Sequence, residues 1–190
     1  MTRIGVLAVQ GAFAEHRAAL DSLGAESFEI RNRGDVKERF DGLILPGGES
    51  TAMKKLLTDL DLFEPLKRMI RDGLPVFGTC AGMILLAKEL SGGETPCFGT
   101  LDVVVKRNAY GRQLGSFRCM ERFADREIEE RFIRAPYVER VGEGVEILSE
   151  HDGKIVAVRQ DNQLAVAFHP ELTDDATVYR YFLNLIDRRR

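Results

Sequence analysis

The sequence of 190 residues lacks any long hydrophobic run and any excess of positive charge. Its apolar stretches are much shorter than the roughly 20 residues that a membrane-spanning helix needs. The 27 Lys and Arg residues against 30 Asp and Glu residues give a net charge of −3, so the composition gives no general basic surface for nucleic acid or anionic lipid. We therefore expect a protein that binds neither nucleic acids nor membranes.

Cysteine and histidine are also scarce, with three residues of each. The cysteines, Cys80, Cys97 and Cys119, cannot all pair within the chain, and their spacing matches no zinc motif. Residues 1–13 hold one short apolar run, which indicates a buried strand and lacks the features of a signal peptide. These absences favour a reducing, cytoplasmic setting, and we expect neither a metal nor a cofactor.

The first ninety residues or so alternate between strand and helix patterns. Apolar runs at residues 3–9, 42–45 and 75–79 predict strands buried on both faces, and residues 26–31 predict a further strand. Helical patterns follow at 12–24, through 53–57 with Ser50 or Thr51 as the cap, at 62–73 with Asp61 as the cap, and from Cys80 to about Leu90.

The second half carries shorter strand patterns, followed by an amphipathic helix over residues 174–187. The strand patterns lie at residues 101–106, 132–134, 146–148, 155–159 and 164–168. Strand–helix alternation followed by short strands predicts one α/β domain over residues 1–190. We expect three α/β/α layers around a flavodoxin-like, mostly parallel sheet, with antiparallel additions in the second half.

One cysteine lies in a pattern that suits a nucleophile. Gly78-Thr79-Cys80-Ala81-Gly82 has the form Gly-x-nucleophile-x-Gly between a strand and a helix, which is the nucleophile elbow of hydrolases. Glycines suit this turn because its backbone is strained and its neighbours leave no room for flanking side chains. A buried, inert thiol remains the alternative for Cys80 on this pattern alone.

A histidine and a glutamate can serve this cysteine. His169 follows the strand at 164–168, and open parallel sheets gather functional residues at the carboxyl ends of their strands. Glu171 lies two positions later, on the same side of an extended chain, where its carboxylate can orient the imidazole. A structural histidine is the alternative for His169 alone, but the three residues together favour a Cys-His-Glu triad.

Acyl transfer also needs N–H donors for the oxyanion of the tetrahedral intermediate. Ala81, directly after the nucleophile, can supply one donor, and Gly47 or Gly48 in the loop after the strand at 42–45 can supply another. A tight turn that requires positive φ is the plainer interpretation of these glycines. A phosphate-binding loop is disfavoured because the lysine spacing of such loops is missing.

Several stretches between residues 4 and 173 resemble the class I (triad) glutamine amidotransferases. Within that class, the sequence is most similar to the glutaminase subunits of pyridoxal 5′-phosphate synthase. The stretches are IGVLAVQGAFAEH, LILPGGEST, FGTCAGM, VVVKRNAYGRQ, FIRAP, SEHDGKIVA and AFHPELT. The charged segment 121–131 is the part least like the family.

The resemblance implies that the chain hydrolyses L-glutamine to L-glutamate and ammonia. It implies a thioester on Cys80, with His169 as the base and Glu171 as its orienting group. Gly48 and Ala81 would hold the oxyanion. The residues that it assigns to glutamine are Gly48, Glu49, Ser50, Arg107, Ile133 and Arg134. The arginines suit the carboxylate of the substrate.

The resemblance also implies a protein partner, because the family delivers its ammonia to a separate synthase subunit with the fold of a TIM barrel, which builds pyridoxal 5′-phosphate. Gln10 and His16 resemble the region that meets this partner and senses docking, although a solvated helix residue is an equal alternative for His16. Three other functions stay open: a glutaminase for another ammonia acceptor, a peptidase or deglycase with an elbow cysteine, and a non-enzymatic scaffold. The order His169-Pro170-Glu171 disfavours the second, and a complete triad disfavours the third.

Overall fold

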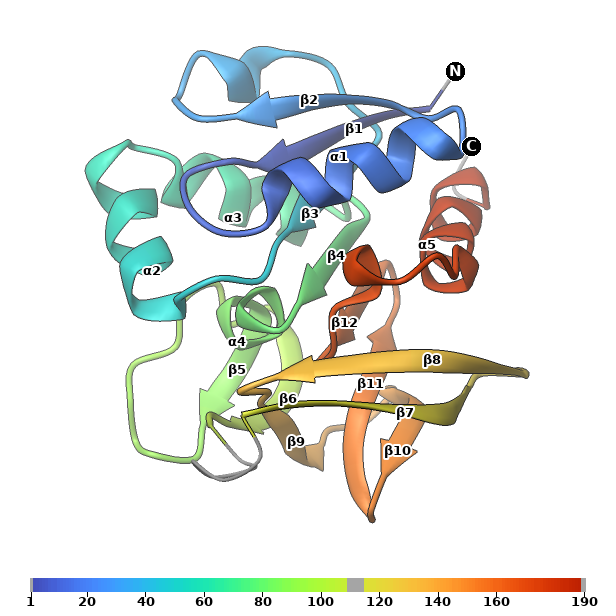
Figure 1. Ribbon diagram of the computed structural model, residues 1–190. Helices are drawn as coiled ribbons and strands as arrows, with labels where there is room; N and C mark the ends of the chain where they lie inside the picture. Colours follow the sequence, from blue (N-terminus) through green and yellow to red (C-terminus); the bar gives the residue numbers. More distant parts are fainter. Residues whose placement is uncertain (1, 109–114, 189–190) are drawn as a thin grey trace.

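The computed structural model describes residues 2–108 and 115–188 (Figure 1). The helices are α1 Phe13–Ser22, α2 Ser50–Asp59, α3 Phe63–Arg71, α4 Ala81–Leu86 and α5 Thr177–Asp187, with 3-10 turns η1 Asp35–Lys37 and η2 Pro170–Leu172. The strands are β1 Arg3–Leu7, β2 Glu26–Ile30, β3 Gly42–Leu45, β4 Val76–Thr79, β5 Ala87–Leu90, β6 Leu101–Lys106, β7 Ser116–Phe123, β8 Arg126–Ile133, β9 Tyr137–Val141, β10 Glu146–His151, β11 Lys154–Gln160 and β12 Gln163–Val166.

The main sheet has the order β2-β1-β3-β4-β12-β11-β9-β6-β5, with β10 paired to β11. The strands from β2 to β12 in this order pair in parallel, whereas β11 pairs antiparallel with β12, β9 and β10. In Figure 1, α1 lies in front of β1 and the fainter α3 lies behind it. The predicted α/β class, with a parallel first half and antiparallel additions, is therefore confirmed.

Strands β3 and β4 are buried along their whole length, as their continuous apolar sequences predict for strands covered by helices on both faces. Helix α5 covers β4 through aromatic contacts: the Phe77 ring centroid lies 5.9 Å from Tyr179 and 5.5 Å from Phe182. Buried side chains from both halves of the chain form one hydrophobic cluster. This continuity suits the one domain that we predict.

Several local predictions were wrong. The helix after Cys80 ends at Leu86, because Ala87 turns to extended backbone (φ −54°, ψ 136°) and residues 87–90 pair with β6 as strand β5. Helix α2 is capped by Glu49, not by Ser50 or Thr51. Asp61 caps nothing; it adopts φ 55° in the turn before α3, which has no side-chain cap.

Strands β7 and β9 were not predicted, and β8 is longer than the expected 132–134. Strands β7 and β8 form a separate antiparallel ribbon, and β7 contacts β10 (Figure 1). Within the described ranges, no helix is both long enough and apolar enough to cross a membrane.

Candidate active site

Cys80 lies in a strained turn between β4 and α4. Its backbone has φ 49° and ψ −102°, a conformation that residues other than glycine rarely adopt. Its N–H donates to Val166 O at 2.8 Å. A Cβ on Gly82 would lie 2.1 Å from Leu45 O, so the turn requires glycine there. This is the geometry expected of a nucleophile elbow.

His169 reaches the same edge of the sheet from the neighbouring strand. Strands β12 and β4 run in parallel with Val166 opposite Thr79, so their next residues emerge side by side. His169 Nδ1 lies 2.6 Å from Glu171 Oε1, and the Glu171 side chain is fully buried. Pro170 starts a 3-10 turn, so the extended backbone that we expected here is wrong, although the carboxylate still reaches the imidazole.

The electrostatics of the histidine follow from its two neighbours. Burial alone would lower the pKa of His169, but hydrogen bonds to Cys80 and Glu171 outweigh it and raise the pKa to about 10. Burial opposes ionisation of Glu171, yet the hydrogen bond to His169 holds the pKa of this carboxyl below its usual range. The arrangement thus favours an imidazolium that is hydrogen-bonded to the Glu171 carboxylate.

His16 extends this buried network behind the triad. Its side chain has no exposed surface, and burial lowers its pKa, so the ring is neutral. The Tyr179 hydroxyl oxygen lies 2.7 Å from His16 Nδ1. Because the Glu171 carboxylate faces Nε2, we assign the ring proton to Nε2 and take the Tyr179 hydroxyl as the donor to Nδ1. Nε2 lies 3.1 Å from Thr79 Oγ1 and 3.7 Å from Glu171 Oε2.

This burial excludes the alternative of a solvated helix residue for His16. The side chain lies behind the triad, and its role in sensing a docked partner stays a prediction. Sequence reasoning also missed Tyr179, which carries no motif, and gave Thr79 no role beyond the elbow pattern.

The loop after β3 fits closely between the triad and the N-terminal loop. A Cβ on Gly47 would lie 2.5 Å from His169 Cε1, and one on Gly48 would lie 2.3 Å from Gln10 Oε1. Gln10 Oε1 also accepts the Glu49 N–H at 2.9 Å. Gln10 therefore contacts the loop that we expect to hold the oxyanion, and Gly48 and Ala81 stay the predicted donors.

Glu49, Ser50 and Arg107 lie together beside this loop. The Glu49 carboxylate accepts the N–H groups of Thr51 and Ala52 at the start of α2, and it lies 3.4 Å from Arg107 Nη2. Ser50 and Arg107 line a cavity of about 300 Å³, which the triad residues do not line. Among the described residues, Arg107 Nε is buried without a hydrogen-bond partner.

The end of β8 brings the remaining predicted residues toward the cysteine. Ile133 O lies 4.0 Å from Cys80 Sγ, and Arg131 O accepts the His169 N–H at 2.7 Å. Arg134 follows with φ 45° and an exposed side chain. The end of the VVVKRNAYGRQ stretch, residues 109–113, lies outside the described residues.

The other two cysteines are poor nucleophiles. Burial raises the pKa of Cys97 to about 11, and burial together with nearby carboxylates raises the pKa of Cys119 to about 12. Neither residue has the backbone strain of Cys80. The geometry thus singles out Cys80 among the thiols.

Comparison with known proteins identifies the family of the chain. The model of the SNO glutamine amidotransferase family matches residues 6–188. The chain belongs to this family. Its relatives include a pyridoxal 5′-phosphate synthase subunit PdxT of Methanocorpusculum labreanum, which is 59% identical over 97% of each chain. The PdxT subunit of Streptococcus pneumoniae (strain CGSP14) is 53% identical over 99% of each.

Solved structures extend the comparison. A crystal structure of a glutamine amidotransferase matches with a TM-score of 0.91 at 44% identity, over 97% of this chain and 98% of that one. A putative GMP synthase subunit from Thermoplasma acidophilum matches with a TM-score of 0.71 at 19% identity, over 100% of this chain and 96% of that one, which is a likeness of fold alone. The resemblance that the sequence motifs indicate is confirmed.

Proposed function

We propose that this chain is the glutaminase subunit of pyridoxal 5′-phosphate synthase, which hydrolyses L-glutamine to L-glutamate and ammonia. The observation that carries the proposal is the strained Cys80 beside a His169 whose other ring nitrogen is held by a buried glutamate. The names of the relatives at 53% and 59% identity support the assignment to this synthase.

In the first half of the reaction, the Cys80 thiolate attacks the side-chain amide carbon of glutamine and a C–S bond forms. The N–H groups of Gly48 and Ala81 hold the negative charge that develops on the amide oxygen. His169 then gives its proton to the amide nitrogen, the C–N bond breaks, and ammonia leaves. Glu171 keeps the imidazole in place because its Oε1 holds Nδ1.

In the second half, His169 takes a proton from water, and the resulting hydroxide attacks the thioester carbon. The C–S bond breaks, glutamate leaves, and the thiolate–imidazolium pair returns. Glu49, Ser50, Arg107, Ile133 and Arg134 hold the glutamine in this proposal. The guanidinium groups face its α-carboxylate, for which their planar donor geometry is suited.

The ammonia passes to a partner synthase subunit, which we take to be a TIM barrel. The contact between Gln10 and the Glu49 N–H supports an activation role for the N-terminal loop, since it joins that loop to the oxyanion loop. We place the protein in the cytoplasm because its cysteines are free thiols.

A single variant tests the mechanism. Cys80→Ala should lower glutamate release from glutamine at least about 10⁴-fold while thermal unfolding stays close to that of the wild type. Cys97→Ala is the matched control and should keep full activity. Glutamate release that survives in Cys80→Ala contradicts the mechanism.

The proposed partner is tested by adding the synthase subunit to this chain. Failure of the added subunit to raise glutamate release contradicts the proposed partner.

A further inference from the structure

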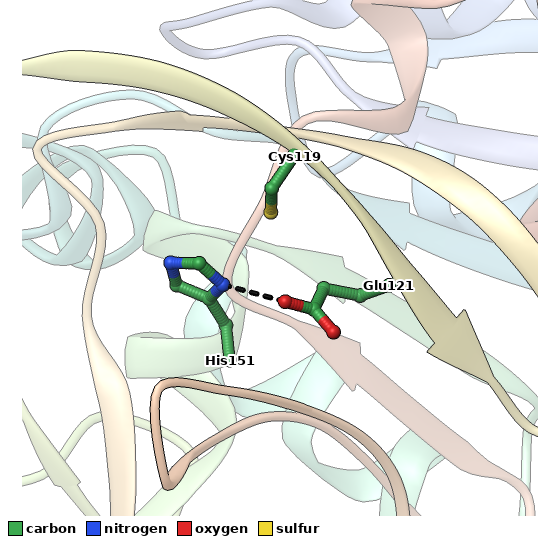
Figure 2. A group of neighbouring side chains, drawn as sticks. All are labelled: Cys119, Glu121 and His151. Carbon is green, nitrogen blue, oxygen red and sulfur yellow. Dashed lines mark hydrogen bonds and ion pairs between the residues drawn. The ribbon is translucent and has the colours of Figure 1, made fainter.

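A second group of one cysteine, one histidine and one glutamate lies away from the active site (Figure 2). Cys119 and Glu121 are two positions apart on β7, so their side chains leave the same face of the strand. His151 is the last residue of β10, which lies against β7. One sulfur, nitrogen or oxygen atom from each side chain lies within 4.8 Å of the other two. Figure 2 shows the thiol and the carboxylate converging on the imidazole.

The separations suit a metal ion after small side-chain rotations. A tetrahedral cation with ligands at about 2.0–2.3 Å needs its ligand atoms roughly 3.3–3.8 Å apart. Nδ1 of His151 and Oε1 of Glu121 lie 2.7 Å apart and would open by less than about 1 Å. The Cys119 sulfur, within 4.8 Å of both, would close by about 1 Å at most.

The imidazole is already oriented for such a role. Its ring packs on the rings of Phe117 and Phe132, with centroid distances of 5.2 and 5.7 Å. His151 Nε2 lies 3.5 Å from Asp152 Oδ2. A carboxylate near the outer ring nitrogen is the usual companion of a metal-binding histidine, because it can hold the proton on that nitrogen once the inner one, which here donates to Glu121 Oε1, coordinates the metal.

A buried carboxylate provides an independent reason to expect a cation. Glu130 lies directly opposite Cys119 in the β7–β8 register, on the same face of the ribbon, and has no exposed surface. Its Oε1 accepts the Ser149 hydroxyl at 2.6 Å, whereas Oε2 has no hydrogen-bond partner among the described residues. An unpartnered buried oxygen is costly, and burial together with the nearby Glu121 raises the pKa of this carboxyl to about 8.

We propose that Cys119, Glu121 and His151 bind a divalent cation of the zinc class, and that a water in the fourth position links the ion to Glu130 Oε2. Sulfur, nitrogen and oxygen together favour Zn²⁺ over Mg²⁺ or Ca²⁺. On binding, the Cys119 thiol releases its proton to solvent and its sulfur bonds the metal, while the proton that His151 Nδ1 donates to Glu121 passes through solvent to Nε2 and frees Nδ1 to coordinate.

Such an ion would join β7 to β10 and thereby stiffen the β7–β8 ribbon. The end of this ribbon contacts the active site, because Arg131 O accepts the His169 N–H and Ile133 O faces Cys80 Sγ. The ion would therefore act on stability and on the placement of β8. It would take no part in the attack on the substrate.

The test uses the full chain with Cys80→Ala and Cys97→Ala, so that Cys119 is the last thiol. Titration with Zn²⁺ followed by calorimetry should show one equivalent bound. Titration with Co²⁺ should give a thiolate-to-metal absorption band. Zinc at about 100 times its dissociation constant should raise Tm by roughly 5–10 °C.

In the same background, Cys119→Ser and Glu121→Gln should each weaken zinc binding at least about tenfold. Glu129→Gln is the matched control: it changes the neighbouring carboxylate of β8, which lies on the opposite face of the ribbon, and should leave zinc affinity unchanged. Unchanged binding in Cys119→Ser and Glu121→Gln overturns the site, as does the absence of zinc binding below about millimolar concentration.

If those two variants fail to fold, the site can be tested by X-ray absorption of the zinc-loaded chain that carries only Cys80→Ala and Cys97→Ala. One sulfur neighbour at about 2.3 Å supports the site, whereas a shell of nitrogen and oxygen alone overturns it.

Discussion

Tyr179 shows how far the buried part of the active site extends beyond the triad. Its hydroxyl donates to His16 Nδ1 at 2.7 Å, and both side chains are almost fully buried. Tyr179→Phe removes the donor and leaves Nδ1 unsatisfied, at a cost of about 1–3 kcal/mol. We expect Tm to fall by roughly 2–12 °C in thermal unfolding. Tyr137→Phe, on the partly buried β9, is the control and should change Tm much less; an equal effect of both variants would count against the network.

The pKa of His169 gives stability a pH dependence of definite sign. The pKa is about 10 in the folded protein, above the 6.5 of a free imidazole, so the folded state holds more protons between these values. Its stabilising contribution is complete below about pH 6.5 and is lost as the pH rises toward 10, by at most about 1.4 kcal/mol per pH unit.

His169→Asn should lack this contribution. Urea unfolding at about pH 7 and about pH 9 should therefore show a smaller loss of stability in the variant than in the wild type. Equal losses would show that the histidine does not keep its proton through the hydrogen bonds to Cys80 and Glu171.

The sequence indicates the triad residues because their immediate neighbours form recognisable patterns: glycines lie on both sides of Cys80, and Pro170 lies between His169 and Glu171. It does not indicate Tyr179, because the hydroxyl and its partner His16 are 163 positions apart. Only the packing of α5 and α1 on the same sheet brings them together. For the same reason, the sequence left open whether His16 is a solvated helix residue: its helix position alone does not reveal that the side chain is buried against Thr79 of β4.

At the scale of elements, the contact between α4 and β3 depends on Gly82. A Cβ there would lie 2.1 Å from Leu45 O, a backbone atom that no side-chain rotation can move. Gly82→Ala should therefore destabilise the protein by about 3 kcal/mol or more, which corresponds to a fall in Tm of roughly 6–12 °C.

The control for this prediction is Gly92→Ala. An added Cβ at Gly92 has its nearest neighbouring atom 3.7 Å away, so Tm should stay within about 2 °C of the wild type. Should Gly82→Ala unfold at the wild-type temperature, the close approach of α4 to β3 would be refuted.

The sequence predicts well those strands whose residues are apolar throughout. Strands β3 and β4 are apolar along their whole length because helices cover both faces. Strands β5 and β7 are different: β5 exposes Lys88 and Glu89, and β7 alternates partly buried with exposed, often charged residues. Their strand character comes from pairing with β6 and β8, and pairing outweighs the local pattern.

At the scale of the whole molecule, two loops from different parts of the sequence meet above the triad. The loop between β1 and α1 contributes Gln10, and the loop between β3 and α2 contributes Gly47, Gly48 and Glu49. Two hydrogen bonds join them: Glu49 N to Gln10 Oε1 at 2.9 Å, and Ala12 N to Gly47 O at 3.0 Å. A partner that moves the N-terminal loop would therefore also move the backbone beside His169.

Gln10→Ala tests this connection. The variant loses the acceptor of the Glu49 N–H, so docking can no longer fix the loop that carries Gly47 and Gly48 through this side chain. In a mixture with the synthase subunit, we expect the stimulated rate of glutamate release to fall about tenfold, while size-exclusion chromatography still shows the complex. Gln160→Ala, which removes an acceptor of the Asp102 N–H at β6, is the control and should keep full stimulation. Full stimulation in Gln10→Ala would mean that the partner acts on the triad by a route that bypasses the N-terminal loop.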